Sequence, residues 1–133
     1  MIGLDTNVLA RYITQDDERQ GRLAKRFLET QLTAETPGFV NHVVLCELVW
    51  VFETAYDYSR EQIMQTLQRL FESAFVRFES SQIVWRALNM YRQGQGFADA
   101  MLVLINESRG CDFTLTFDKR AAKMKAARLL ADQ

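Results

Sequence analysis

Short apolar runs alternate along the chain with longer stretches in which apolar residues recur at helical spacing. The runs at 1–4, 39–40, 75–78 and 113–116 predict strands, because turn or capping residues lie beside each of them. Between them, apolar residues recur every three or four positions, which predicts helices. Parallel strands need crossover connections, and helices usually provide them. We therefore expect an α/β sandwich with a mainly parallel sheet.

The first long helix is expected after an acidic start at residues 16–18. Its Leu23, Phe27 and Leu28 have the spacing of one buried stripe. The charges at its start, Asp16 among them, are expected to be merely solvated.

Capping residues predict where several other helices begin. Ser59 and Gln62 have the spacing of a capping box, and Ser80 or Ser81 is expected to cap the helix through residue 91. After Asp118 the composition predicts a basic, alanine-rich helix, with a last edge strand at 128–130.

The segment 43–56 is apolar on nearly every face, which predicts a central or interfacial helix. Its Trp50, Phe52 and Tyr56 are expected to be core or dimer contacts rather than a platform on which RNA bases stack. Together with the stripe at 63–71, this segment holds more apolar residues than one small core needs. We therefore expect a homodimer, with burial in the protein's own core as the alternative.

Composition narrows the class of protein. A chain of 133 residues fits one domain spanning 1–133, and 16 basic against 17 acidic residues give a net charge of −1. This balance neither marks nor excludes a nucleic-acid-binding protein. The longest apolar run, 100–105, is too short to cross a membrane, and the opening residues do not form a signal peptide, so we expect a cytoplasmic protein. Cys46 and Cys111 lie in or beside apolar stretches and are expected to be reduced core thiols.

Four of the acids stand apart because apolar residues surround them in the sequence. They are Asp5, Glu47, Asp99 and Asp118. Lys and Arg are absent within three residues of the first three acids. Burying an unpaired carboxylate costs several kcal/mol or more, so such acids are expected to bind a cation or a partner.

The predicted elements place these acids at one edge of the sheet. Asp5 and Asp118 follow strands, and Glu47 and Asp99 lie near the starts of buried helices. Carboxylates that converge repel one another, and a hard divalent cation such as Mg²⁺ or Mn²⁺ stabilises them in the ionised form. Such a set is typical of enzymes that hydrolyse phosphodiesters. For the fourth ligand, Asp118 is preferred to Asp112, because ligands bind beyond the carboxyl ends of parallel strands.

The motifs around these acids resemble those of PIN-domain nucleases, specifically the VapC toxins of toxin–antitoxin pairs. The resemblance rests on residues 5–9, on Glu47 in its apolar helix, on 96–100 and on 114–119, and it covers essentially the whole chain. It implies a PIN-like three-layer α/β/α sandwich. It also implies a Mg²⁺- or Mn²⁺-dependent endoribonuclease that a small cognate antitoxin holds inactive.

The resemblance carries the metal-binding and catalytic roles onto Asp5, Glu47, Asp99 and Asp118. Asn7 and Thr116 match positions that commonly orient a carboxylate or a water, although both could equally cap the helices that follow.

Other polar residues have weaker claims to a functional role. Lys119 and Arg120 follow Asp118 directly and are the best-placed cations for an RNA phosphate. His42 precedes Glu47 by five residues, and a turn or cap role is preferred to a role in the site, because a single histidine specifies little.

Two other classes of function stay open at this point. A Mg²⁺-dependent phosphatase of the haloacid-dehalogenase type also begins with an aspartate after a strand, but it needs a second aspartate where this chain has Asn7. A non-catalytic metal-binding regulator or partner-binding module would suit the net charge near zero, but a receiver-like domain needs adjacent acids that the quartet does not supply.

Overall fold

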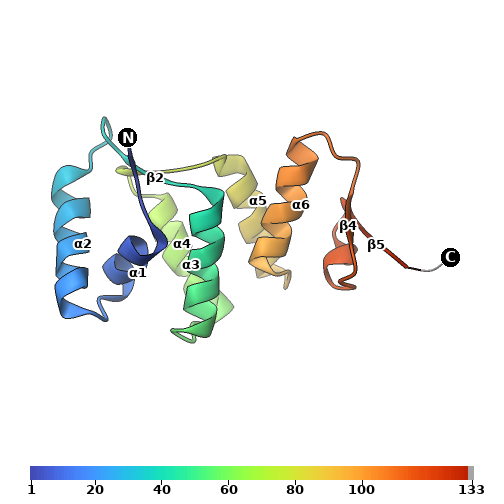
Figure 1. The fold of residues 1–133 in the computed structure, drawn as a ribbon, viewed down its shortest axis with the longest axis horizontal. Coiled ribbons are helices and arrows are strands. Elements are labelled where there is room, and N and C mark those ends of the chain that lie inside the picture. Colours follow the sequence, from blue (N-terminus) through green and yellow to red (C-terminus); the bar gives the residue numbers. More distant parts are fainter. Residues whose placement is uncertain (132–133) are drawn as a thin grey trace. The chain divides into compact units, whose positions relative to one another are not determined.

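A computed structural model of the protein describes residues 1–131, which form two compact units. The first unit comprises residues 1–79, and the second begins at residue 80. Figure 1 follows the chain through both of them.

The first unit contains three strands and four helices. In chain order they are β1 (Ile2–Gly3), α1 (Thr6–Thr14), α2 (Glu18–Gln31), β2 (Gly38–Val40), α3 (His42–Thr54), α4 (Arg60–Phe71) and β3 (Val76–Phe78). The strands form a parallel sheet in the order β1-β2-β3, with Ile2 opposite Gly38 and Gly38 opposite Val76. The carboxyl ends of all three strands therefore share one edge of this sheet.

Side-chain caps explain where the helices of this unit begin. Asp17 accepts a hydrogen bond from the backbone of Gln20 at the start of α2, and Asn41 does the same for Val44 at the start of α3. Before α4, Ser59 and Gln62 form the predicted capping box, with both of its hydrogen bonds present. These caps satisfy N–H groups that lack partners within the helix.

Large apolar side chains from α1 to α4 form the core of the first unit. The fully buried ones are Leu9, Leu28, Leu45, Leu48, Phe52, Ile63 and Leu67, together with Val40 of β2. The predicted stripe on α2 is wrong in part. Leu28 is buried, but Leu23 and Phe27 are 51% and 40% exposed. The buried stripe runs instead through Gly21, Ala24 and Leu28, because its two small residues let α2 pack closely.

The second unit contains a helix pair and a small parallel sheet. Its elements are α5 (Ser81–Arg92), α6 (Phe97–Ser108), β4 (Thr114–Thr116), the short 3-10 helix η1 (Ala121–Lys123) and β5 (Ala127–Leu129). α5 packs against α6, where the rings of Tyr91 and Phe97 meet edge to face at 6.0 Å. β4 pairs with β5 in parallel, with Leu115 opposite Arg128.

Two predictions for the second unit need correction. The basic helix expected after Asp118 is only the three-residue η1, because the chain turns extended at Met124 and pairs with β4 as β5. Helix propensity is a weak preference that tertiary pairing overrides. Ser80 occupies the cap position of α5, but its left-handed backbone (φ 48°) accompanies no side-chain cap.

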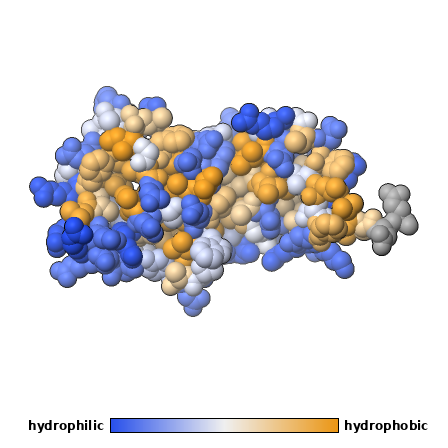
Figure 2. All heavy atoms as spheres, viewed as in Figure 1, coloured by the Kyte–Doolittle hydropathy of each residue, from blue (hydrophilic) through white to orange (hydrophobic). Residues whose placement is uncertain are grey.

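The predicted α/β class with parallel strands is confirmed, since every strand pair within the described residues is parallel. None of the described helices has the length and apolar character needed to span a membrane. Apolar side chains do reach the surface among polar ones on the face that Figure 2 shows.

Candidate functional site

Asp5 lies where β1 ends and α1 begins, and it is the N-cap of that helix. Its backbone is extended, and its Oδ1 accepts a hydrogen bond of 2.8 Å from the backbone N–H of Thr6. The carboxylate therefore stands at the carboxyl end of the parallel sheet. In α/β proteins this is the edge where ligands bind.

Glu47 lies in the second turn of α3 and contacts the same neighbour as Asp5. The hydroxyl of Thr6 donates a hydrogen bond of 3.3 Å to Oε1 of Glu47. Thr6 is only 6% exposed and is the buried polar residue of this edge. The first unit thus brings two of the four predicted acids to one threonine.

The sequence interpretation missed Thr6, although a signal for it was present. Thr6 follows Asp5 directly and opens a helix, so its backbone N–H is available to a neighbouring carboxylate. The contact from its hydroxyl to Glu47 spans 41 positions of the chain, and nothing in the spacing of residues predicts such a contact.

Asp99 lies in the first turn of α6, in the second unit. The N-cap of this helix, Gly96, has an extended backbone (φ −65°, ψ 140°) and makes no side-chain cap. The Asp99 carboxylate leans back toward Gly96: a Cβ built on that glycine would lie 2.9 Å from Oδ2 of Asp99.

Asp118 follows β4 closely, and three backbone groups and one hydroxyl fix its position. Its own N–H donates to Oγ1 of Thr116 over 3.0 Å. Its Oδ1 accepts from the N–H groups of Arg120 and Ala121, at 2.8 and 3.2 Å. Asp112 precedes β4 and so lies before the amino end of the strand, as predicted.

All four acids are exposed, although apolar residues surround them in the sequence. For the two acids on helices, buried apolar neighbours face the other way, whereas Phe117 beside Asp118 is itself 79% exposed. On α3, Leu45, Leu48 and Val49 enter the core while Glu47 faces outward. On α6, Ala100 and Met101 are buried beside the exposed Asp99. The same sequence pattern, an acid among apolar residues, therefore also occurs where the acid lies on the exposed face of a largely buried helix.

The family model of the PIN domain matches residues 2–127. The chain belongs to the PIN domain family. This family model spans residues of both units. The resemblance to PIN-domain VapC proteins, which rested on the acidic motifs, is therefore confirmed.

Two relatives of this PIN domain are named for their activity. Over 122 residues, the chain is 25% identical to a VapC ribonuclease of Aquifex aeolicus, and the match covers 91% of this chain and 90% of the relative. It is also similar to the crystal structure of VapC20 of Mycobacterium tuberculosis, a toxin that cleaves the sarcin–ricin loop. That match has 18% identity and a TM-score of 0.46, and it covers 92% of this chain and 94% of the other.

The donor atoms of this PIN domain suit a hard cation. Carboxylate oxygens are the ligands that Mg²⁺ and Mn²⁺ prefer, and no predicted ligand is a thiol or an imidazole. Within either unit, the described residues do not bring three or more His, Cys, Asp or Glu side chains close enough to hold a metal ion. The four-acid set therefore stays a prediction.

The residues that were predicted to support the site or to bind substrate differ in their contacts. The hydroxyl of Thr116 accepts a hydrogen bond from the backbone N–H of Asp118, and its predicted role in orienting a carboxylate or a water stays a prediction. Asn7 is not the cap of α1, because Asp5 is, and the Asn7 side chain is exposed. Lys119 and Arg120 are exposed, and the carbonyl of Arg120 accepts from Nε2 of Gln95 over 3.0 Å.

His42 is not the cap of α3, which is Asn41, but the first residue of that helix, and it contacts Glu79. Its ring Nε2 lies 2.8 Å from the carbonyl oxygen of Glu79, and its backbone N–H donates to Oε1 of Glu79 over 2.9 Å. These contacts join the start of α3 to the end of β3.

Asp16 is not merely solvated, contrary to the sequence-based expectation, but joins α1 to the end of α3. The hydroxyl of Tyr56 and the guanidinium of Arg11 each donate to Oδ2 of Asp16 over 2.7 Å. These hydrogen bonds, that of Tyr56 first, hold the pKa of Asp16 well below its usual range. Asp16 is therefore unsuitable as a neutral control for substitutions in the site.

The aromatic residues predicted in and just after α3 lie partly in the core and partly at the surface, and the two cysteines differ in the same way. Phe52 is fully buried and Tyr56 is half-buried, but Trp50 is 64% exposed. Cys46 is half-buried, and burial raises the pKa of its thiol to about 11. Cys111 is exposed, so the expectation of two core thiols is wrong for this residue.

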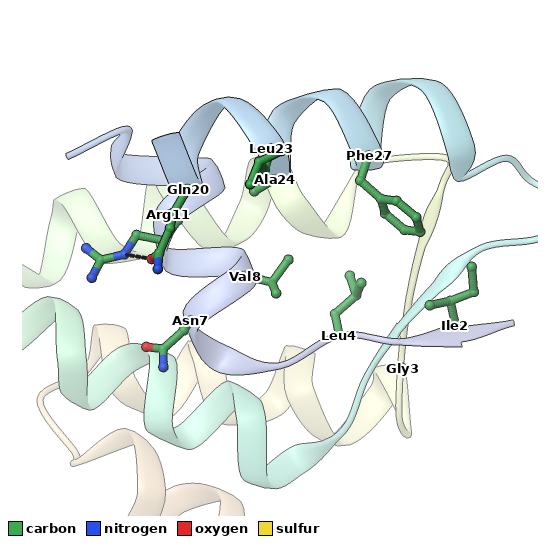
Figure 3. A pocket seen from close by; sticks show the side chains of 10 residues that line it. All are labelled: Ile2, Gly3, Leu4, Asn7, Val8, Arg11, Gln20, Leu23, Ala24 and Phe27. Carbon is green, nitrogen blue, oxygen red and sulfur yellow. Dashed lines mark hydrogen bonds between the residues drawn. The ribbon is translucent and has the colours of Figure 1, made fainter. Parts of the chain in front are cut away.

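A largely apolar groove of about 560 Å³ lies in the first unit, on the side of α1 that faces α2. Figure 3 shows Leu23 and Phe27 of α2 facing Val8 of α1 and Ile2 of β1. At one end, Nε of Arg11 donates to the Gln20 side chain over 2.9 Å. The two α2 residues expected in the core thus line this groove instead.

Proposed function

We propose that this PIN domain is an endoribonuclease that hydrolyses RNA phosphodiester bonds, and that it is the toxin of a toxin–antitoxin pair. The observation that carries the proposal is the joint attachment of Asp5 and Glu47 to Thr6, at the edge of the parallel sheet where ligands bind. Membership of the PIN family and the similarity to a VapC ribonuclease support the choice of RNA as substrate.

Asp5, Glu47, Asp99 and Asp118 are proposed as the metal ligands and catalytic residues. Mg²⁺ or Mn²⁺, when bound, would supply a Lewis acid for the phosphoryl oxygens and lower the pKa of a water. The chain's own part is to hold the oxygen atoms in place. Thr6 does so for the first two acids, and the backbone around η1 does so for Asp118.

The substrate side of the proposal rests on Lys119 and Arg120. Both are exposed and directly follow Asp118, so their charges can reach a phosphate near that carboxylate. Thr116 fixes the backbone at the start of this basic pair through its contact with the N–H of Asp118.

A cognate antitoxin is the proposed partner, and the groove is its proposed binding surface. The exposed Leu23 and Phe27 give this groove an apolar wall that a partner segment can cover. We further propose that the toxin is a cytoplasmic homodimer in which the exposed Trp50 contributes to the interface between copies. Light scattering that shows only monomer at high micromolar concentration would contradict the dimer.

RNA cleavage after removal and return of the metal tests the proposed activity. Purified protein is treated with EDTA, mixed with single-stranded RNA, and then given Mg²⁺, Mn²⁺ or Ca²⁺. Cleavage that stops with EDTA and returns with Mg²⁺ or Mn²⁺ supports the proposal. RNA left intact in every metal, with hydrolysis of a small phosphomonoester instead, would contradict it and favour a phosphatase.

A further inference from the structure

We propose that Gly96 is a positioning residue for Asp99, because the Asp99 carboxylate occupies the space that any other side chain at position 96 would fill. This inference rests on the proposed function, in which Asp99 binds the metal. A Cβ at position 96 would lie 2.9 Å from Oδ2 and 3.6 Å from Cγ of Asp99. Neighbouring atoms essentially never come as close to a real Cβ as this Oδ2 would, so the carboxylate would have to turn aside. The end of this exposed side chain can do so at little cost, so a Cβ at position 96 would displace the carboxylate without disrupting the helix.

The backbone at Gly96 does not itself require glycine. Its φ of −65° and ψ of 140° are values that every residue adopts. By contrast, Gly94 and Gly110 have φ values of 109° and 91°, which disfavour other residues. What sets Gly96 apart is therefore the space above it, which the Asp99 carboxylate occupies.

Glycine also has no side chain that could cap α6 at this position. Ser, Asp and Asn are preferred to glycine at the N-cap, although glycine is itself common there. Asp17, Asn41 and Ser59 cap other helices of this protein with their side chains. α6 begins without such a hydrogen bond. Serine at position 96 would supply the missing cap and at the same time push the carboxylate of Asp99 aside.

The two effects of serine make Gly96→Ser a sharp test. If Gly96 serves only as a helix cap, serine leaves the melting temperature equal or higher and leaves metal binding unchanged. If Gly96 positions Asp99, the melting temperature without metal still holds or rises, but affinity for Mg²⁺ or Mn²⁺ falls. Because the partners of carboxylate ligands tune metal affinity, we expect a loss of about 10-fold or more.

The experiment measures Mn²⁺ binding by calorimetry and melting temperature without metal, for wild type, Gly96→Ala and Gly96→Ser. Gly96→Ala adds a Cβ without a hydroxyl that could cap the helix or contact the metal. It should also bind Mn²⁺ more weakly than wild type. A crystal structure of Gly96→Ser should show the Asp99 carboxylate displaced from its place above residue 96.

The outcomes separate this inference from the proposed function. A wild type that binds Mn²⁺ and cleaves RNA, with a Gly96→Ser variant that binds Mn²⁺ equally tightly, would overturn the role of Gly96 alone. A wild type that neither binds Mn²⁺ nor cleaves RNA would overturn the proposed function, and the role of Gly96 with it. If Gly96→Ser fails to fold, undiminished Mn²⁺ affinity in Gly96→Ala would still overturn the inference.

Discussion

Thr6 and Glu47 lie 41 positions apart in the chain, and the hydroxyl of the first donates a hydrogen bond of 3.3 Å to the carboxylate of the second. The backbone N–H of the same threonine donates a hydrogen bond to the carboxylate of Asp5. One buried residue thus sets the positions of two exposed acids, one from the start of α1 and the other from the middle of α3.

Thr6→Val tests this arrangement, because valine keeps the shape of threonine and removes only the hydroxyl. We expect RNA cleavage and Mg²⁺ affinity to fall about 10- to 100-fold, as is usual when a partner of a metal ligand is lost. Stability should change by about 1 kcal/mol or less, since the exposed Glu47 can hydrogen-bond to water instead. Thr66→Val is the matched control, because the Thr66 hydroxyl donates to the backbone of its own helix. Equal loss in both variants would contradict the role of Thr6.

Asp16 should make the stability of the protein depend on pH in the acid range. Its pKa is lowered in the folded state by hydrogen bonds from Tyr56 and Arg11, so it stabilises the fold above its unfolded pKa of about 3.9. This contribution is lost as the pH falls below about 4. The melting temperature of wild type should therefore fall more steeply in acid than that of Asp16→Asn, which starts lower at neutral pH. Parallel curves for the two proteins would contradict this account.

Asp118 and Asp112 lie on opposite sides of β4, and only Asp118 follows the strand. Ligands of parallel sheets bind beyond the carboxyl ends of the strands, so Asp118 and not Asp112 stands where a metal ion would bind. Asp118→Asn should lose metal affinity and cleavage, although the asparagine oxygen can still accept the N–H of Arg120. Asp112→Asn should keep both properties. The reverse result, measured by calorimetry and RNA cleavage, would show that the fourth motif is wrongly placed.

The groove should bind the antitoxin without taking part in cleavage. Phe27→Ser and Leu23→Ser remove apolar area from its wall and should weaken the complex about 10-fold or more, because a few apolar anchors dominate most interfaces. RNA cleavage by the free toxin should be unchanged. Leu102→Ser, at a residue of α6 that is as exposed as Leu23, serves as the control. Unchanged antitoxin affinity in the Leu23 and Phe27 variants would contradict the proposed binding surface.

The sequence predicted local features of the fold well. Strand positions, the capping box at Ser59 and the helix start at Asp5 depend on neighbouring residues, so they can be read from spacing alone. It also placed Asp5 at the carboxyl end of a parallel strand, which the sheet of the first unit confirms.

Features that depend on contacts between distant segments could not be predicted in the same way. The sequence pattern cannot show that Thr6 reaches Glu47, or that Asp16 meets Tyr56. Hydrophobicity alone placed Leu23 and Phe27 in the core, but the small residues Gly21 and Ala24 decided which face of α2 is buried. Whether Asp5, Glu47, Asp99 and Asp118 bind metal together stays a prediction.

The most direct test of the proposed activity compares wild type and Asp99→Asn for cleavage of the same single-stranded RNA, at saturating Mg²⁺ and after EDTA. The substitution keeps the size of the side chain and removes its charge, and Glu35→Gln, at an exposed position before β2, controls for the loss of a remote charge. We predict that wild type and Glu35→Gln cleave the RNA in Mg²⁺ but not after EDTA. Asp99→Asn should cleave under neither condition. Equal cleavage by wild type and Asp99→Asn would contradict the account.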